Sequence, residues 1–590
     1  MIGSAPVEVP IGLRAGQWVT LRAQRTVLVI VHNVTTLTRL LEVLPVFDSD
    51  RRVQLVASWS GSDPFQDGLT EMMRSLRIVT IPWDQAKQTR FDLAISASHH
   101  GGLTDITAPL VILSHGLGYN KYSPGNRKPE TGNRKPETGN RKPETGNRKP
   151  ETGNRKPETF GLSPQWVLYD GEPVARALAL AHEAEVQRLA AVAPAAVPTA
   201  VVVGDPCFDR IIAGLEHRHR YRSLLRSDGR TVVMVASTWG STSLLGTAPD
   251  LLRRLLTELP ADSYQVLAAL HPNIWHGHGP WQIRSWLADC VRSGLVLLPE
   301  IDGWRTGLIA ADVVLGDHGS VTGYSAAAGR PVILGAFAEN DISPESPAGA
   351  LAAAAPRLEL REALPAQLDE AINTHHTDRY TALTALATSA PGEALQRLRS
   401  LFYEVLTLPE PPGEVPSPTL PTTGLTDAVP APGSIAMFVG YSVRIDDREV
   451  TLDRSPAELH GSEPTTPSSP HAAPDVHLMC PSDYPLGSLR GNAAVLTCPR
   501  AALPGPAAEW LPTVFAANPA CSLVAVFDAD VTTVTTRTGQ MLEVRSSAPP
   551  ETGASIIYGW LASGGSLESL APGVELTLGS RRHLVSVRLT

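Results

Sequence analysis

Short apolar runs alternate with stretches of helical period along the first two thirds of the chain. The runs have the length of strands and end in polar residues, while the segments between them space apolar residues three and four apart. This alternation predicts parallel sheets with helices on both faces. Strands are expected at residues 26–31, 53–57, 78–81, 93–96, 109–113, 166–169, 199–203, 231–236, 265–270, 295–298, 312–315 and from 331, and helices at 36–46, 173–191, 249–259, 281–293, 304–310, 320–328, 361–373 and 391–406.

Residues 310–334, AADVVLGDHGSVTGYSAAAGRPVIL, form the most informative stretch. A buried strand is followed by a polar loop at 316–319, a small-residue helix that opens at Ser320, a stop at Gly329 and a second strand. Open α/β sheets bind ligands at the carboxyl ends of their strands. The Ser320 hydroxyl is expected to cap the helix, and the N–H groups of its first turn attract anions such as phosphate. The stretch predicts a nucleotide-phosphate site, with an ordinary, well-capped βαβ unit as the alternative.

The last third of the chain has a different pattern. Residues 408–433 are dense in Pro, Thr and Gly and predict an extended linker. Beyond it, a strand-rich α+β module is expected, in which His477, Cys480, Cys498 and Asp528 show no ligand spacing, so an accessory or partner-binding role is the default. Its strands are expected at residues 435–439, 494–497, 522–527, 531–535, 555–558, 574–578 and 584–589.

Composition narrows the class of protein. A chain of 590 residues with 43% hydrophobic and 18% charged residues is typical of a globular protein of several domains. The net charge of −9 argues against dedicated nucleic-acid binding. Five scattered cysteines signal neither a disulfide framework nor a zinc site, and they fit a reducing cytoplasm. No run approaches the ~18 apolar residues of a membrane span. Any contact of the protein with the inner face of the membrane would therefore be peripheral.

Five consecutive copies of GNRKPET occupy residues 125–159. Each copy carries a net charge of +1, so the block contributes +5 and the remainder of the chain −14. Apart from glycine and proline, every residue of the block has a polar or charged side chain. Because such a block cannot bury a core, it is expected to be an exposed, mobile loop. Expansion of one copy in a tolerant loop explains it most simply, because loop length costs little entropy. A basic arm for anionic lipid or a polyanionic substrate is the functional alternative.

These patterns divide the chain into five segments. A leader covers residues 1–25, and a first Rossmann-like domain, which carries the repeat insertion, covers 26–198. The Gly-Asp-Pro turn at 204–206 marks the crossing into a second Rossmann-like domain at 199–407, followed by the linker at 408–433 and the module at 434–590. Two α/β domains in succession predict a ligand cleft between them.

Four motifs occur in an order that resembles a known family. The order GDPxFD, a strand running into ASTWGS, then LHPN, then the 310–334 stretch is similar to GT-B-type glycerophosphotransferases that use CDP-glycerol. More distantly it resembles UDP-N-acetylglucosamine 2-epimerases and other GT-B glycosyltransferases. The resemblance covers about residues 26–406. It implies two Rossmann-like domains in the GT-B arrangement, with the acceptor bound by the first domain and the nucleotide donor by the second.

The resemblance also implies roles for individual residues. The donor diphosphate would meet the strand end at Ser237 and Thr238, the HP pair at His271, and the turn of Asp317, Gly319 and Ser320. His115 and Gly116 match the His-Gly turn that faces the acceptor, and His115 is the candidate general base because imidazole titrates near neutral pH. His271 is the second candidate catalytic residue, as a hydrogen-bond donor or a cation.

The chain departs from the family pattern at two places. At a third place, a group of histidines suggests a metal site as an alternative. His318 replaces the usual aromatic residue of the turn, and the helix at 320–328 has no carboxylate to hold a ribose or sugar. The acceptor-side turn reads HGLGYNKY rather than an HGTPLK-like sequence. His276 and His278, with His271 nearby in the sequence, suggest a metal site. No carboxylate or cysteine follows at ligand spacing, so neither a metal nor a cofactor is expected.

The sequence therefore predicts a cytoplasmic GT-B transferase of cell-envelope polymer synthesis. It would move a glycosyl or polyol-phosphate group from a nucleotide-activated donor to a hydroxyl acceptor, which could be lipid-linked. A nucleotide-sugar epimerase or glycosyltransferase is the alternative of the same class. A catalytically inactive GT-B scaffold that binds a partner through the C-terminal module is the alternative of a different class. The oligomeric state is not predicted.

Overall fold

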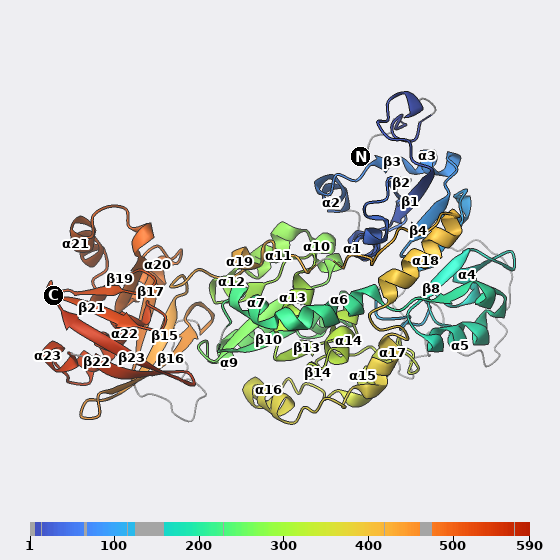
Figure 1. Ribbon diagram of the computed structural model, residues 1–590. Coiled ribbons are helices and arrows are strands. Elements are labelled where there is room, and N and C mark those ends of the chain that lie inside the picture. The colour runs from blue at the N-terminus through green and yellow to red at the C-terminus, as the bar shows by residue number, and fades with distance from the viewer. Residues whose placement is uncertain are drawn as a thin grey trace, which may run out of the picture. The chain divides into compact units, whose positions relative to one another are not determined.

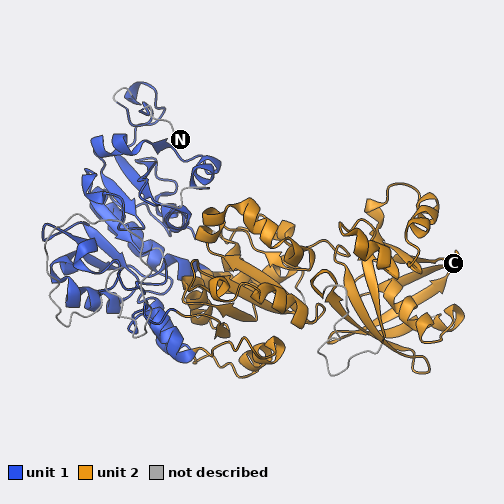
Figure 2. Ribbon diagram, turned by 180° about the vertical axis from the view of Figure 1, so that it is seen from behind, with its two compact units in different colours: residues 1–210, 338–354, 380–418 blue, residues 211–337, 355–379, 419–590 orange. Residues whose placement is uncertain are grey.

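The computed structural model describes residues 6–12, 15–63, 68–114, 116–123, 158–227, 229–417, 419–460, 475–571 and 573–590. The chain forms two compact units (Figure 2): unit 1 comprises residues 1–210, 338–354 and 380–418, and unit 2 comprises residues 211–337, 355–379 and 419–590. Each unit is assembled from segments that are distant in the sequence.

Unit 1 is built on a seven-stranded parallel sheet with the order β3-β2-β1-β4-β5-β8-β9 (Figure 1). Its first five positions follow the strand order of a Rossmann fold, so the first α/β region has the parallel sheet that the sequence predicts. The strands are β1 (Arg25–Val31), β2 (Val53–Trp59), β3 (Thr80–Ile81), β4 (Leu93–Ser96), β5 (Leu110–Leu113), β8 (Ala177–Leu180) and β9 (Ala200–Val202).

Alternate residues of β1 explain why both faces of this sheet are covered. Val27 and Val29 lie in one buried cluster with Leu37 of α1 and Phe402 of α18, while Leu28 lies in the cluster on the other face. A strand that is buried on both faces reads as a continuous apolar run. The helices of unit 1 are α1 (Val34–Val43), α2 (Leu69–Ser75), α3 (Trp83–Gln88), α4 (Pro164–Val167), α5 (Glu183–Val192), α15 (Pro347–Ala354), α17 (Thr381–Ala387) and α18 (Ala394–Leu406), and α6 (Pro206–Gly214) starts in unit 1.

Unit 2 contains a second parallel sheet, of five strands, with the order β12-β11-β10-β13-β14. This order repeats the Rossmann arrangement, so the second α/β region also has the predicted parallel sheet. Its strands are β10 (Thr231–Ser237), β11 (Tyr264–Leu270), β12 (Val296–Leu297), β13 (Val313–Gly316) and β14 (Val332–Leu334). The helices around it are α7 (Arg218–Leu224), α8 (Leu244–Thr247), α9 (Leu251–Glu258), α10 (Pro272–His278), α11 (Pro280–Trp286), α12 (Ala288–Arg292), α13 (Gly303–Ala310), α14 (Ser320–Ala327), α16 (Leu364–Asn373) and α19 (Leu425–Ala428).

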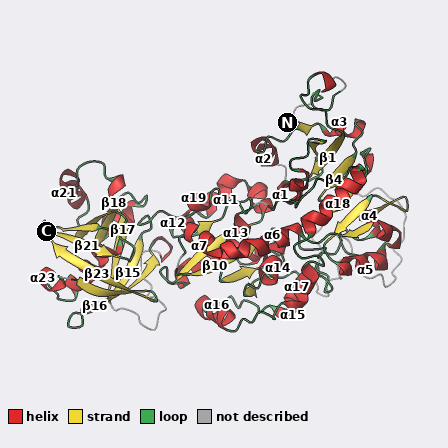
Figure 3. Ribbon diagram, in the orientation of Figure 1, coloured by secondary structure: helices red, strands yellow, loops and turns green. Residues whose placement is uncertain are grey.

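The C-terminal part of unit 2 is a closed barrel of nine strands rather than an open α+β module (Figure 3). Helix α22 (Thr552–Ala562) contacts strands around the barrel and buries Ile556, Ile557 and Trp560 completely, so it fills the core. The strands are β15 (Met437–Arg444), β16 (Glu449–Pro456), β17 (Asp475–Pro481), β18 (Val495–Pro499), β19 (Leu523–Phe527), β20 (Thr532–Thr536), β21 (Met541–Ser546), β22 (Gly573–Leu578) and β23 (Arg581–Leu589); the other helices are α20 (Gly487–Asn492), α21 (Ala507–Ala517) and α23 (Leu567–Leu570).

Four local predictions were wrong. The helix predicted at 173–191 is strand β8 followed by α5, because Ala177–Leu180 is buried between β5 and β9 and sheet pairing overrides the helix propensity of Ala and Leu. The strand predicted at 555–558 lies inside α22. Residues 166–169 divide between α4 and β6 (Leu168–Tyr169), which pairs with β7 (Glu172–Pro173). The linker predicted at 408–433 contains α19 and buries Leu420 and Leu425, so it is not extended throughout.

The predicted mobile repeat falls almost entirely outside the described residues. Among the described residues, no helix combines the length and the apolar character that a membrane crossing requires. All five cysteines are buried free thiols.

Candidate functional site

The predicted phosphate site lies at the carboxyl edge of the unit 2 sheet. Strands β10 and β13 are parallel neighbours, with Val235 opposite Leu315, so the loops that follow them start side by side. The loop after β10 carries Thr238, and the loop after β13 carries Asp317 and Gly319. The structure therefore brings together two motifs that are about eighty residues apart in the sequence.

Asp317 joins these two loops. Its side chain is fully buried, and its Oδ2 accepts hydrogen bonds from the Thr238 N–H (2.8 Å), the Thr238 hydroxyl (2.7 Å) and the Leu244 N–H (3.0 Å). Its Oδ1 accepts the Gly319 N–H at 3.0 Å. Four donors therefore satisfy the carboxylate, which organises the two loops.

Helix α14 begins directly beyond this junction. Its N-cap residue is Gly319, which has no side chain to cap the helix, and Ser320 is the first helical residue. The predicted capping role of Ser320 was therefore wrong by one position. A Cβ atom on Gly319 would lie 2.5 Å from Thr238 Cγ2, so the close approach of the loops requires glycine here. No side chain caps the start of α14, and the positive end of the helix dipole lies there.

Ser237 and His271 border the same edge. The Ser237 hydroxyl donates to the Thr238 carbonyl at 2.9 Å and accepts the Leu245 N–H at 3.1 Å, so it shapes the loop. His271 is the N-cap of α10, and its Nδ1 accepts the Asn273 N–H at 3.0 Å. This bond places the proton of the neutral imidazole on Nε2.

A histidine–carboxylate pair at this edge was missed by the sequence analysis. His276, on α10, is buried, and its Nε2 forms a short hydrogen bond to Glu300, which follows β12. The available signal was the position of Glu300 just beyond a strand end. Close by in the sequence, Trp304 of α13 stacks on Tyr324 of α14 with ring centroids 5.9 Å apart.

The metal alternative finds no ligand cluster. His276 is engaged with Glu300, and His278 packs edge-on against Trp286. In the part of the chain that the structure describes, no three His, Cys, Asp or Glu side chains gather where they could hold a metal ion.

In unit 1, the position of the predicted base, His115, lies outside the described residues. The preceding residue, Ser114, directly follows β5, and its carbonyl accepts a hydrogen bond from the Arg39 Nε at 2.9 Å. Arg39 also forms buried ion pairs with Glu42 (3.1 Å) and with Asp205 (2.8 Å) of the GDPxFD motif. Asp205 in turn accepts the Cys207 N–H at the start of α6. Arg39 therefore joins α1, the β5 loop and the start of α6.

Aromatic rings and imidazoles gather at the same edge of the unit 1 sheet. His100 contacts Phe160 and Trp166, with ring centroids 5.5 and 4.8 Å away, and burial lowers the pKa of His100. His32 is buried and its Nε2 bonds to the His100 carbonyl at 2.7 Å.

Two hollows in the described residues lie away from the predicted site residues. One of about 730 Å³ lies on the barrel and includes Arg448, Arg545 and Leu584. The other, of about 520 Å³, lies in unit 1 and includes Arg25, Asp92 and Leu406. Neither hollow contains a predicted site residue.

Comparison with known proteins gives similar structures only. No family model matches the chain, and no curated protein sequence matches it. The chain is similar to the structure of the Wall Teichoic Acid Polymerase TagF, with 13% identity, a TM-score of 0.41, and coverage of 66% of this chain and 90% of that chain. It is similar to the S. aureus MnaA-UDP co-structure, with 11% identity, a TM-score of 0.40, and coverage of 67% of this chain and 99% of that chain. It is also similar to Anabaena HepE in complex with UDP-glucose, with 12% identity, a TM-score of 0.38, and coverage of 65% of this chain and 99% of that chain.

Proposed function

We propose that the chain is a GT-B-type transferase whose unit 2 sheet binds the diphosphate of a nucleotide-activated donor. The observation that carries this proposal is the Asp317 junction. It holds the Thr238 loop against the start of α14 and leaves that helix start without a side-chain cap. Helix N-termini at the carboxyl edge of a parallel sheet are anion sites because their N–H groups and dipole converge on one point.

The proposed reaction assigns a role to each predicted residue. The Ser320 hydroxyl and the first-turn N–H groups of α14 would bind the phosphates, and the His271 Nε2–H would donate to the oxygen on which negative charge develops. Ser237, Thr238, Asp317 and Gly319 would shape the pocket rather than touch the ligand, because their polar side chains or close contacts are already used within the loops.

The acceptor side of the proposal rests on the sequence resemblance. His115 would take the proton from the acceptor hydroxyl as its oxygen attacks the transferred group. With a CDP-glycerol-like donor, the new bond joins that oxygen to the glycerol-bearing phosphorus. The bond from this phosphorus to the bridging oxygen breaks, and CMP leaves with the electron pair. With a nucleotide-sugar donor, the sugar carbon is attacked instead and the nucleoside diphosphate leaves.

A thermal-shift screen tests the donor site. The purified chain is heated with CDP-glycerol, CDP-ribitol, UDP-sugars, GDP-sugars and free nucleotides. A ligand at a hundredfold excess over its Kd stabilises the folded state by about 2.7 kcal/mol. We expect one nucleotide class to raise the melting temperature of the wild type and to lose most of that effect in the Ser320→Ala, His271→Ala double variant.

The matched control is His376→Ala, which removes an exposed histidine that pairs with Asp378. It should keep the full ligand shift. If no donor shifts the wild type, or if the double variant responds as fully as the control, the donor-site proposal is wrong.

One observation favours an inactive scaffold as the second candidate. Helix α14 has no acidic residue in its first turn and presents no carboxylate for a ribose or sugar hydroxyl. In that case the barrel would carry the function by binding a partner. A wild type that responds to none of the nucleotides, yet folds and melts cooperatively, is the result that this candidate predicts.

A further inference from the structure

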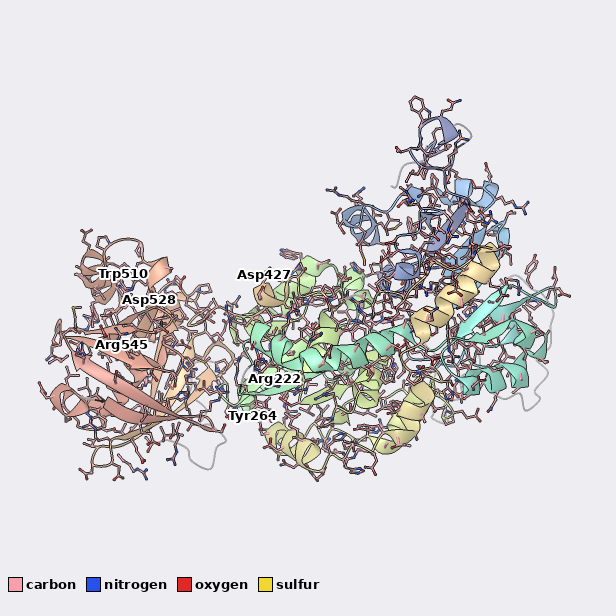
Figure 4. All side chains as sticks on the ribbon, viewed as in Figure 1. Arg222, Tyr264, Asp427, Trp510, Asp528 and Arg545 are labelled. Atoms are coloured by element: carbon pink, nitrogen blue, oxygen red, sulfur yellow. The ribbon has the colours of Figure 1, made fainter. Side chains whose placement is uncertain are left out.

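A cluster of arginines lies at the opposite, amino edge of the unit 2 sheet. Asp312 directly precedes β13, and Arg330 precedes β14, which pairs with β13 in parallel. The Val314 N–H donates to the Pro331 carbonyl at 2.9 Å, which fixes these two strand starts side by side. Arg222, labelled in Figure 4, comes from α7 together with Arg218. The cluster is therefore separated from the Asp317 junction by the length of β13.

The positive charge of this cluster exceeds its negative charge. Asp312 pairs with both Arg218 (2.5 Å) and Arg222 (2.8 Å) and also accepts the Val232 N–H at 2.8 Å. The remaining N–H groups of these two arginines reach backbone carbonyls, including those of Ile309 and Ala310. A single carboxylate thus serves two guanidinium groups and a backbone amide.

Arg330 is the third guanidinium of the cluster. No hydrogen bond or ion pair joins its side chain to any residue that the structure describes, and its Nε is shielded from solvent. Burial and the charges of Arg218 and Arg222 lower the pKa of Arg330 to about 10, against the opposing effect of Asp312. A partly buried charge without a partner is costly, and an anion that pairs with it would recover that cost.

The geometry points to a second anion site, in which Arg330, supported by Arg218 and Arg222, binds a small phosphate-class oxyanion at the amino edge of the sheet. The planar guanidinium matches two oxygens of a phosphate and can form two parallel hydrogen bonds. This site is independent of the proposed donor site. Its residues lie at the amino edge of the sheet, whereas Thr238 and Asp317 lie at the carboxyl edge.

Titration calorimetry with inorganic pyrophosphate tests this site. Four proteins are compared: the wild type, Arg330→Gln, the Ser320→Ala, His271→Ala double variant, and Arg582→Gln as a matched control. Arg582 lies on the barrel with 75% of its side chain exposed and pairs with Glu575. Loss of a charge-assisted hydrogen-bonded pair should raise the Kd roughly 10- to 100-fold in Arg330→Gln.

The other variants should keep the pyrophosphate affinity of this site. An unchanged Kd in Arg330→Gln, or loss of binding only in the Ser320→Ala, His271→Ala double variant, would overturn the inference, because the anion would then sit elsewhere. If Arg330→Gln does not fold, wild-type crystals soaked in tungstate decide the matter. An anomalous peak beside the Arg330 guanidinium supports the site, and tungstate peaks confined to other positions contradict it.

Discussion

The two parallel sheets share a strand order but hold their carboxyl-edge loops together by different chemistry. In unit 1, the charged Arg39 bridges Glu42, Asp205 and the Ser114 carbonyl, all of them buried. In unit 2, the lone carboxylate of Asp317 is satisfied by neutral N–H and O–H donors. The loops at the carboxyl edge are therefore held together by a buried ion cluster in unit 1 and by hydrogen bonds to one carboxylate in unit 2. In unit 2, the helix that starts at this junction, α14, has no side-chain cap.

The largest effect should come from removing the ion cluster. Arg39→Met leaves Glu42 and Asp205 buried without their cation, and breaking a buried ion pair in this way costs about 3–5 kcal/mol. We expect unit 1 to unfold at a lower denaturant concentration and the amides of β1 and β5 to exchange faster, as measured by hydrogen-exchange mass spectrometry.

The control for this change is Arg74→Met. Arg74 is 66% exposed and pairs with Glu71 on the surface of α2, so its loss should change stability by no more than about 0.5 kcal/mol. If Arg39→Met is as mild as this control, the buried cluster does not hold the unit 1 edge together.

A smaller loss is expected from Asp317→Ala. The substitution leaves the N–H groups of Thr238, Leu244 and Gly319 without their acceptor, and we expect a loss of roughly 2–3 kcal/mol, below that of Arg39→Met, because no charge is stranded. The exposed Asp250, whose side chain makes no capping bond to α9, gives the matched control Asp250→Ala. Calorimetric unfolding of unit 2 measures the stability of both variants. If Asp317→Ala lowers the free energy of unfolding more than Arg39→Met does, the comparison between the two units is reversed.

Two glycine substitutions test the close approach of the unit 2 loops. Gly319→Ala places a methyl group 2.5 Å from Thr238 Cγ2, and the resulting overpacking should cost about 1–3 kcal/mol and abolish any donor-induced thermal shift. Gly491→Ala, in α20, meets nothing within 4 Å and should stabilise by about 0.5–1 kcal/mol through helix propensity. Opposite signs for the same chemical change would support the steric argument, and equal signs would contradict it.

The sequence was sufficient to predict the two sheets because their strands are buried on both faces. Runs such as residues 231–236 and 265–270 are long, apolar and followed by polar loops, and local pattern alone identifies them. Strand β8 was missed because Ala177–Leu180 has the composition of a helix, and only its position between β5 and β9 makes it a strand. Likewise, nothing local shows that α18 returns to unit 1, where Phe402 stacks on Phe47 at 5.6 Å.

The candidate site was predictable to the extent that its residues follow strands. Thr238, Asp317 and His271 were predicted in this way, and the structure adds that Asp317 uses its carboxylate to join the loops. Arg39 was not found, because its partners Ser114 and Asp205 lie 75 and 166 residues away and no pattern connects them. The His276–Glu300 pair was also missed, because the position of Glu300 beyond a strand end does not identify its partner, and only the folded sheet brings the ends of β11 and β12 together.

The smallest effect should come from shortening the GNRKPET block. The Ser123 N–H donates to the Glu158 carbonyl at 2.8 Å, and the Phe160 N–H donates to the Lys121 carbonyl at 2.8 Å, so the chain enters and leaves the block at adjacent points. Removing four whole copies keeps this root intact and should stabilise unit 1 by about 1 kcal/mol, since each halving of a loop lowers its closure cost by about 0.6 kcal/mol. A variant of full length with Arg and Lys of the copies replaced by Gln is the matched control and should melt as the wild type does. If the shortened chain is less stable than both, the copies make contacts that hold unit 1 together, and the edge beside Ser114 depends on more than the Arg39 cluster.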